Sequence, residues 1–153
     1  MIVVSDTSAI TSLLQIGRVQ ILQQMYGTVF VPDAVERELR CSHAALPDFI
    51  IAVPVHDAEG VARFLPQLQQ GEAEAIVLAK EVKARALLID EKRGRAVAMQ
   101  EGLRVIGLVG VLTAAKMKGL IPSLAATLDD LESKADFRMS AALKSGALRS
   151  VGE

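Results

Sequence analysis

Short apolar runs rich in β-branched residues alternate along the chain with longer segments of helical periodicity. The runs cover residues 1–5, 28–32, 49–55, 85–90 and 104–107. The helical patterns between them cover residues 9–25, 33–40, 58–68, 71–84, 91–102 and 108–119. Strands of this length separated by helices predict βαβ crossovers and a sheet that helices cover on both faces. We therefore expect an α/β fold, a three-layer α/β/α sandwich with a mainly parallel central sheet.

Two further helical patterns follow Pro122, at residues 124–135 and 140–151. We interpret residues 1–153 as a single domain, with residues 123–153 as a C-terminal helical extension that packs laterally or forms a dimer contact. Residues 10–25 and 120–135 hold more Leu and Ile than one sheet face requires. Core packing and dimerisation both account for that excess.

Composition narrows the classes of function. Hydrophobic residues make up 51% of the chain but aromatic residues only 3%, which argues against base recognition by stacked aromatic side chains. A net charge of −1 means that a polyanionic partner must be held by a local basic patch or through metal ions. The single cysteine, Cys41, excludes an internal disulfide and fits a reducing compartment. With neither a long apolar stretch nor a signal-peptide pattern, we expect no membrane span and a cytoplasmic location.

Two aspartates end predicted strands. Asp6 directly follows the run at residues 1–5, and Asp90 ends the run at residues 85–90. In a parallel α/β sheet, ligands bind beyond the carboxyl ends of the strands. Each aspartate also fits the N-cap of the helix that follows it. The pattern leaves both interpretations open.

A glutamate lies among the apolar positions of the helix predicted at residues 33–40. Helical periodicity places Glu38 in the same arc as Val35 and Leu39, whereas Glu36 falls on the solvent face. A carboxylate on a buried face must be neutralised, paired with a cation or bound to a metal. Glu38 is therefore a candidate site residue.

The helix predicted at residues 71–84 offers a third acid. Glu72 and Glu74 are two residues apart and point in different directions, so they cannot both serve one site. Glu74 shares a charged stripe with Glu81 and Arg85, a pattern typical of an exposed face. Glu72 lies at the edge of the apolar arc in the first turn, where a negative charge also suits the helix dipole. The pattern favours Glu72 and leaves Glu74 as the alternative.

A cluster of carboxylates without His or Cys partners selects a hard divalent cation, Mg²⁺ or Mn²⁺, over Zn²⁺. His43 and His56 lie in loop-like segments without a spaced partner. The sequence also lacks a nucleophile elbow, a Walker motif and a dinucleotide-binding motif. The remaining chemistry is metal-assisted reaction at a phosphate.

Five segments together resemble a known family. In order they are VVSDTSAIT, VEREL, GEAEAIVLA, LLIDEKRGRAVA and RVIGLVGVLTAAKMKGLI. Over about residues 2–122 they resemble the PIN domain, and in particular its small prokaryotic branch of VapC-type toxins. The FRMS segment and the final GE are similar to that branch as well. The resemblance implies a metal-dependent endoribonuclease with four acids at Asp6, Glu38, Glu72 or Glu74, and Asp90.

The resemblance also implies roles for the residues. Asp6, Glu72 and Asp90 would hold Mg²⁺ or Mn²⁺, Glu38 would position the attacking water, and Ser8 would hydrogen-bond that water or a carboxylate. Glu91 is a further supporting acid. Many PIN domains have Asp as the third acid, so a Glu there leaves the coordination open. The basic residues after Asp90 are candidates for contacts with RNA phosphates: Lys92, Arg93 and Arg95. The implied partners are RNA, a small antitoxin protein and a second copy of the chain.

Two other functions compete with the nuclease. One is a non-catalytic PIN-like module that binds RNA or a protein, although a binding role does not require four acids. The other is a phosphatase of the HAD-like type, which also begins with a strand ending in Asp. That mechanism needs a second acid two residues later, where this chain has Ser8.

Overall fold

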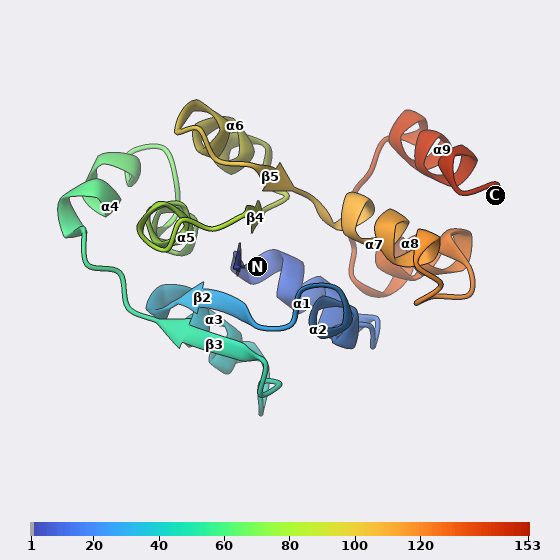
Figure 1. Ribbon diagram of the computed structural model, residues 1–153, viewed down its shortest axis with the longest axis horizontal. Helices are drawn as coiled ribbons and strands as arrows, with labels where there is room; N and C mark the ends of the chain where they lie inside the picture. The colour runs from blue at the N-terminus through green and yellow to red at the C-terminus, as the bar shows by residue number, and fades with distance from the viewer. Residues whose placement is uncertain (1) are drawn as a thin grey trace.

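The computed structural model describes residues 2–153, and over this range five strands form one parallel sheet in the order β3-β2-β1-β4-β5 (Figure 1). The strands are β1 (Val3–Ser5), β2 (Val29–Pro32), β3 (Ile50–Val53), β4 (Ala86–Leu88) and β5 (Val105–Ile106). The helices are α1 (Thr7–Gln15), α2 (Gln20–Tyr26), α3 (Asp33–Ser42), α4 (Ala58–Phe64), α5 (Gln70–Glu81), α6 (Lys92–Gln100), α7 (Leu108–Met117), α8 (Leu124–Lys134) and α9 (Ala141–Ser150).

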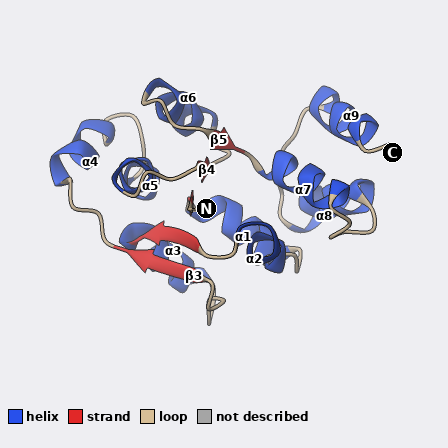
Figure 2. Cartoon of the chain, in the orientation of Figure 1, coloured by secondary structure: helices blue, strands red, loops and turns tan. Residues whose placement is uncertain are grey.

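Helices cover both faces of the sheet (Figure 2). One apolar cluster joins the sheet to α4, α5 and α6, and the other joins it to α1, α2, α3, α7 and α8. Side chains alternate between the two clusters along a strand, so that Leu87 packs with the first and Leu88 with the second. The central strands β1 and β4 are buried throughout, which explains their uninterrupted apolar sequences. The predicted three-layer α/β/α sandwich is confirmed.

The segment predicted as one helix at residues 9–25 is two helices. That prediction was wrong because the chain turns at Gly17, whose φ of 70° lies in the left-handed region. The turn lets α2 pack its Ile21 and Leu22 into the same cluster as α1. The apolar periodicity of the sequence continues across this break and therefore does not reveal it.

The C-terminal segment is built into the core through α8. Leu124, Leu128 and Leu131 are fully buried, in the same cluster as Ile10 and Leu13 of α1. Helix α9 has no fully buried residue and packs on α7 and α8 from outside. The excess of Leu and Ile at residues 120–135 is therefore used in core packing within the chain.

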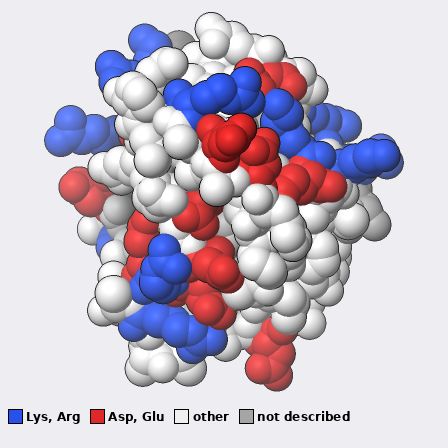
Figure 3. Space-filling model, turned by 90° about the vertical axis from the view of Figure 1, so that its left-hand side faces the viewer, with Lys and Arg blue, Asp and Glu red and all other residues white. Residues whose placement is uncertain are grey.

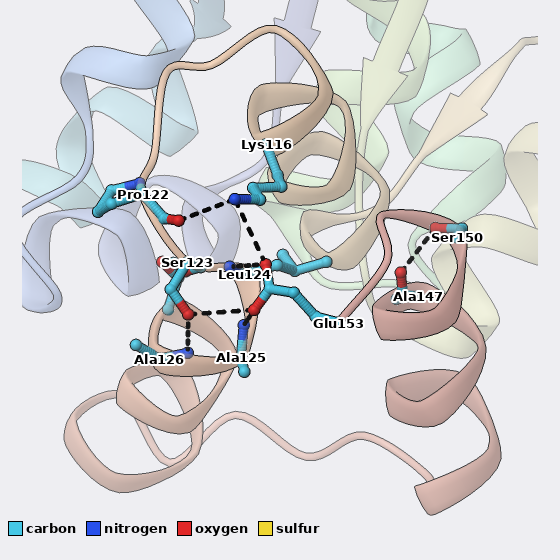
Figure 4. Close-up of polar contacts among 10 residues, drawn as sticks. Lys116, Pro122, Ser123, Leu124, Ala125, Ala126, Ala147, Ser150 and Glu153 are labelled. Carbon is cyan, nitrogen blue, oxygen red and sulfur yellow. Dashed lines mark hydrogen bonds and ion pairs between the residues drawn. The ribbon is translucent and has the colours of Figure 1, made fainter.

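Glu153 fastens the segment after α9 to the start of α8 (Figure 4). Its carboxylate accepts hydrogen bonds from the Leu124 amide at 2.7 Å, the Ala125 amide at 3.0 Å and the Ser123 hydroxyl at 3.1 Å. The Lys116 ammonium lies 3.7 Å away. The hydrogen bonds from Ala125 and Leu124 are the main reason why the pKa of Glu153 is lowered.

Candidate active site

A cavity of about 1050 Å³ opens where β1 and β4 end. Its walls come from the start of α1, from α3, from the α4–α5 connection and from the start of α6. This placement follows from the parallel topology, because the carboxyl ends of neighbouring strands meet at one edge of the sheet. The charged and hydroxyl side chains that line it are Asp6, Thr7, Ser8, Thr11, Glu38, Glu72, Glu91, Lys92 and Arg93.

Asp6 lies at the centre of this arrangement and is only 3% exposed. It is the N-cap of α1, because one carboxylate oxygen accepts a hydrogen bond from the Ala9 amide at 3.1 Å. The other oxygen accepts one from the Ser8 hydroxyl at 3.2 Å. The pKa of Asp6 is raised from 3.8 to about 7, mainly by burial and in smaller part by the carboxylates of Asp90 and Glu72, while the hydrogen bonds from Ala9 and Ser8 lower it. Capping and a place in the site are therefore compatible.

Asp90 lies beside Asp6 but faces α7. Both of its oxygens accept a hydrogen bond from the Leu108 amide, at 3.1 and 3.2 Å. Of the two interpretations left open for Asp90, the cap of the following helix is wrong, because Glu91 is the N-cap residue of α6. Strand β5 runs parallel to β4 and ends beside it, which brings the first amide of α7 to the Asp90 carboxylate. Burial raises the pKa of Asp90, while the Leu108 amide and the Arg95 guanidinium lower it.

The structure separates Glu72 from Glu74. Glu72 lines the cavity and accepts a hydrogen bond from the Gln69 amide at 3.3 Å in a capping box. Burial raises its pKa, and the carboxylates of Glu91 and Glu38 add to the effect. Glu74 accepts hydrogen bonds from the Ala34 amide and the Gln70 side chain, and it lines a different cavity. Of the two, Glu72 is the one placed with Asp6.

Glu38 lies at the rim of the core. The expectation of a carboxylate on a buried helix face was wrong, because Val35 and Leu39 are fully buried whereas Glu38 is exposed. The core ends at this edge of α3 and the cavity begins, so the Glu38 side chain reaches the cavity while its apolar neighbours stay packed. The Thr7 hydroxyl donates a hydrogen bond of 2.7 Å to its carboxylate.

A family model described as a PIN domain matches residues 2–153, nearly the whole chain. The chain belongs to the PIN domain family. PIN domains are generally nucleases that use divalent metal ions. No curated protein matches the chain. Within residues 2–153, none of the helices has the length and apolar character that a membrane span requires.

The basic residues at the start of α6 divide into two groups in this PIN domain. Lys92 and Arg93 are exposed and line the cavity beside Glu91. Arg95 does not line it, because its guanidinium turns toward the Ile89 carbonyl at 3.4 Å and lies beside Asp90. Its position suits holding the Asp90 carboxylate more than meeting a substrate.

The residues that were set aside from the sequence lie outside the cavity lining. His56 pairs with Glu81 at 3.5 Å, and Cys41 is exposed at the end of α3. His43 lies 3.4 Å from the hydroxyl of Thr11, which does line the cavity.

Three glycines that the sequence did not single out let helices approach the acids closely. A Cβ atom on each would meet a carboxylate oxygen or crowd it: Gly71 with Glu38 at 2.7 Å, Gly107 with Asp90 at 2.8 Å and Gly94 with Glu72 at 3.1 Å. The signal available in the sequence was a glycine in or just before the first turn of three successive helices. The role of these glycines depends on where the acids lie, which the sequence does not show.

The donor chemistry of the PIN site fits a divalent cation. Asp6, Glu72 and Asp90 supply hard oxygen donors. Burial raises the pKa of all three, and neighbouring carboxylates add to the effect at Asp6 and Glu72. A cation relieves that unfavourable charge. Among residues 2–153, however, no three acid, histidine or cysteine side chains surround a single point closely enough to hold an ion as they stand.

Proposed function

We propose that this PIN domain is a Mg²⁺- or Mn²⁺-dependent endoribonuclease that hydrolyses phosphodiester bonds in RNA. The observation that carries the proposal is the cavity at the ends of β1 and β4, into which Asp6, Glu38 and Glu72 project. Asp90 lies near enough to raise the pKa of Asp6, and two exposed cations, Lys92 and Arg93, stand on the same rim. Membership of the PIN family supports the same chemistry.

The proposed roles follow from the contacts. Asp6, Glu72 and Asp90 would hold the cation, which when bound would activate water and stabilise charge on the phosphate. Glu38, hydrogen-bonded to Thr7, orients the water that attacks the phosphorus. Ser8 holds the Asp6 carboxylate in place.

On the substrate side, Lys92 and Arg93 bind phosphate oxygens. The water oxygen forms a bond to the phosphorus, and the bond between the phosphorus and the leaving sugar oxygen breaks. The proton that the water gives up balances the one that the leaving oxygen takes up. This division of labour separates residues that hold the cation from residues that hold the strand.

The test is cleavage of a mixed-sequence single-stranded RNA with Mg²⁺, Mn²⁺ or EDTA. We expect activity that needs the metal and that falls at least about 100-fold in Asp6→Asn and Glu38→Gln. Glu36→Gln is the matched control, because Glu36 lies on the same helix as Glu38 but does not line the cavity. Its carboxylate pairs with the Arg40 guanidinium at 3.4 Å. Cleavage that persists in EDTA, or equally in Asp6→Asn, would overturn the proposal.

The second candidate is a PIN module that binds RNA without cutting it. The observation in its favour is that no three metal-binding side chains surround one point among residues 2–153. It predicts no cleavage by folded protein supplied with metal and freed of partners, and RNA binding that Asp6→Asn leaves unchanged. Thermal unfolding with and without metal also distinguishes the two candidates and needs no activity assay. Only the nuclease predicts that Mg²⁺ or Mn²⁺ raises the Tm of the wild type but not that of Asp6→Asn.

We further propose that the protein is the toxin of a type II toxin–antitoxin pair and acts as a homodimer with a small antitoxin as partner. The ordered motifs shared with the VapC-type branch support this role. Induced expression is expected to arrest growth in a way that requires Asp6. Unimpaired growth at high levels of active nuclease would contradict the toxin role, and a monomeric mass in sedimentation at micromolar concentration would contradict the dimer.

A further inference from the structure

A second cavity adjoins the candidate active site. It measures about 310 Å³, and Leu65 lines both cavities. Its walls come from α3, α4 and the start of α5. The apolar residues that line it are Val55, Ala58, Val61, Ala62 and Leu65, and the polar or charged residues are Asp33, Arg37, Gln70 and Glu74. Asp33 forms no ion pair with Arg37. The size of this cavity is at the lower end of what small-molecule sites occupy.

Arg37 is the single cation among the described residues that line this second cavity. Its side chain is exposed, and within residues 2–153 it forms no ion pair. The carboxylate of Glu74 in the same cavity is engaged elsewhere, since it accepts hydrogen bonds from the Ala34 amide at 3.1 Å and from the Gln70 side chain at 2.6 Å. Arg37 therefore presents a guanidinium whose donors are not used by the protein.

The charge around the acids is negative, so attraction of a polyanion depends on local cations such as Arg37. The chain has a net charge of −1, and the first cavity carries four carboxylates, so the protein as a whole does not attract a polyanion. Lys92 and Arg93 supply cations on the α6 side of the acids, and Arg37 supplies one on the α3 side. On the side of the molecule that carries α4, Lys and Arg side chains lie above and below a group of Asp and Glu side chains (Figure 3).

We propose that the second cavity is a subsite for a nucleotide of single-stranded RNA that flanks the scissile phosphate, with Arg37 binding the phosphate of that nucleotide. This inference rests on the proposed function. The strand crosses the acids from the Lys92 and Arg93 rim to Arg37, and Leu65 marks the passage between the two cavities. The apolar floor contacts the sugar or the face of the base. A base paired in a duplex cannot turn into a recess, so the subsite selects single strands.

The test measures binding by fluorescence anisotropy in the Asp6→Asn background, so that cleavage does not interfere. The probe is a labelled single-stranded RNA of about 12 nucleotides, titrated over a range of KCl concentrations. The affinity K falls as salt rises, and losing one phosphate contact is expected to reduce the steepness of log K against log salt by about 0.7. We expect that change in Arg37→Gln, with several-fold weaker binding at low salt, and we expect Arg37→Lys to restore the slope.

Arg40→Gln is the matched control. Arg40 lies one turn along the same helix, is exposed, pairs with Glu36 and lines neither cavity. Its removal changes the net charge equally but leaves the subsite intact. Equal effects of Arg37→Gln and Arg40→Gln on the slope would show general attraction by charge and overturn the subsite. Arg37 and Arg40 are both exposed, so circular dichroism should find both variants folded.

Substrate length provides a second arm. A dinucleoside monophosphate has one phosphate, which occupies the acids, and no second phosphate for Arg37, so it should bind wild type and Arg37→Gln equally. A loss of affinity that is the same for short and long RNA would overturn the proposal. In cleavage by the active enzyme, Arg37→Gln should raise KM for long RNA and leave kcat within about twofold, as expected for a contact made equally in ground and transition states.

The nuclease proposal and the subsite proposal can be refuted independently of each other. Wild-type protein that binds single strands in an Arg37-dependent way but never cleaves them would retain the subsite and refute the nuclease. Metal-dependent cleavage with no effect of Arg37→Gln on binding, KM or salt slope would retain the nuclease and refute the subsite.

Discussion

At the scale of single residues, Asp6 performs two tasks that normally conflict. As the N-cap of α1 it satisfies the Ala9 amide, which stabilises the fold. As a carboxylate that is 3% exposed and lies near Asp90 and Glu72, it is costly to ionise. The cap persists when the group is neutral, so only the charge is unfavourable without a bound cation.

This conflict gives a prediction about pH. The pKa of Asp6 is about 7 in the folded protein against 3.8 normally, so the folded state binds its proton more tightly than the unfolded chain. Stability of the metal-free protein therefore falls as pH rises from about 4 to about 7, by at most about 1.4 kcal/mol per pH unit from this group. Asp6→Asn keeps a capping side chain but does not titrate. In EDTA, its Tm relative to wild type is expected to be higher at about pH 8 than at about pH 5.

The comparison between variant and wild type removes contributions from the titrating groups that do not interact with Asp6. A Tm difference that stays constant across this pH range, or that shrinks toward pH 8, would contradict the assigned direction. Adding Mg²⁺ at pH 8 should narrow the difference, because the cation stabilises ionised Asp6 in the wild type alone.

At the scale of elements, the approach of helices α5, α6 and α7 sets where the acids lie. Each of these helices has a glycine in or just before its first turn, and the missing Cβ leaves room for Glu38, Glu72 or Asp90. Gly71 shows the consequence most clearly, because the atom that its Cβ would meet at 2.7 Å is the end of the Glu38 side chain. A flexible carboxylate can move aside at little cost to packing.

Gly71→Ala should therefore reduce activity without unfolding the protein. The added methyl group displaces the Glu38 carboxylate, and a misplacement of about 1 Å in a catalytic group can lower kcat by about 10- to 100-fold. The Tm should stay the same or rise, since Ala favours a helix more than Gly. Single-turnover cleavage and thermal unfolding measure the two effects.

Gly110→Ala is the control for this experiment, because a Cβ at Gly110 in α7 meets nothing within 4 Å. It should stabilise the protein by about 0.5–1 kcal/mol and leave kcat unchanged. Full activity of Gly71→Ala would show that the close approach of Gly71 to Glu38 does not position the Glu38 carboxylate.

At the scale of the whole molecule, the C-terminal segment belongs to the same packing unit as the sheet. Helix α8 buries three leucines against α1, and Glu153 ties the end of the chain to the start of α8 through two backbone amides. We propose that residues 1–153 unfold as one domain. The term extension describes the position of residues 123–153 in the sequence better than their role in the core.

Leu128→Ala tests this proposal. Leu128 is fully buried, so the substitution should lower the free energy of unfolding by about 2–5 kcal/mol through the cavity that it leaves. A single urea transition, shifted as a whole, is the expected result. Leu143→Ala is the control, since Leu143 on α9 is 50% exposed and its loss should cost less than about 0.5 kcal/mol. Two separate transitions, with only the smaller one shifted, would contradict a single domain.

The sequence determined the fold class and supplied the residues proposed for the candidate site. Alternation of β-branched runs with helical patterns predicted the parallel sheet, because the side-chain periods of strands and helices appear directly in the order of residues. The aspartates after β1 and β4 could be assigned to one edge of the sheet for the same reason, since parallel strands end together. The break at Gly17 was missed because the apolar period continued across it.

Only the tertiary structure decided how the acids relate to one another. Glu72 and Glu74 have similar local sequences, and the contact of Glu74 with the Ala34 amide of α3 separates them. Asp90 looked like a cap for the next helix, yet it binds the Leu108 amide 18 positions later in the chain. The second cavity joins Arg37 to residues of α4 and α5. These relations depend on packing between distant segments, and periodicity along one segment contains no information about what packs against it.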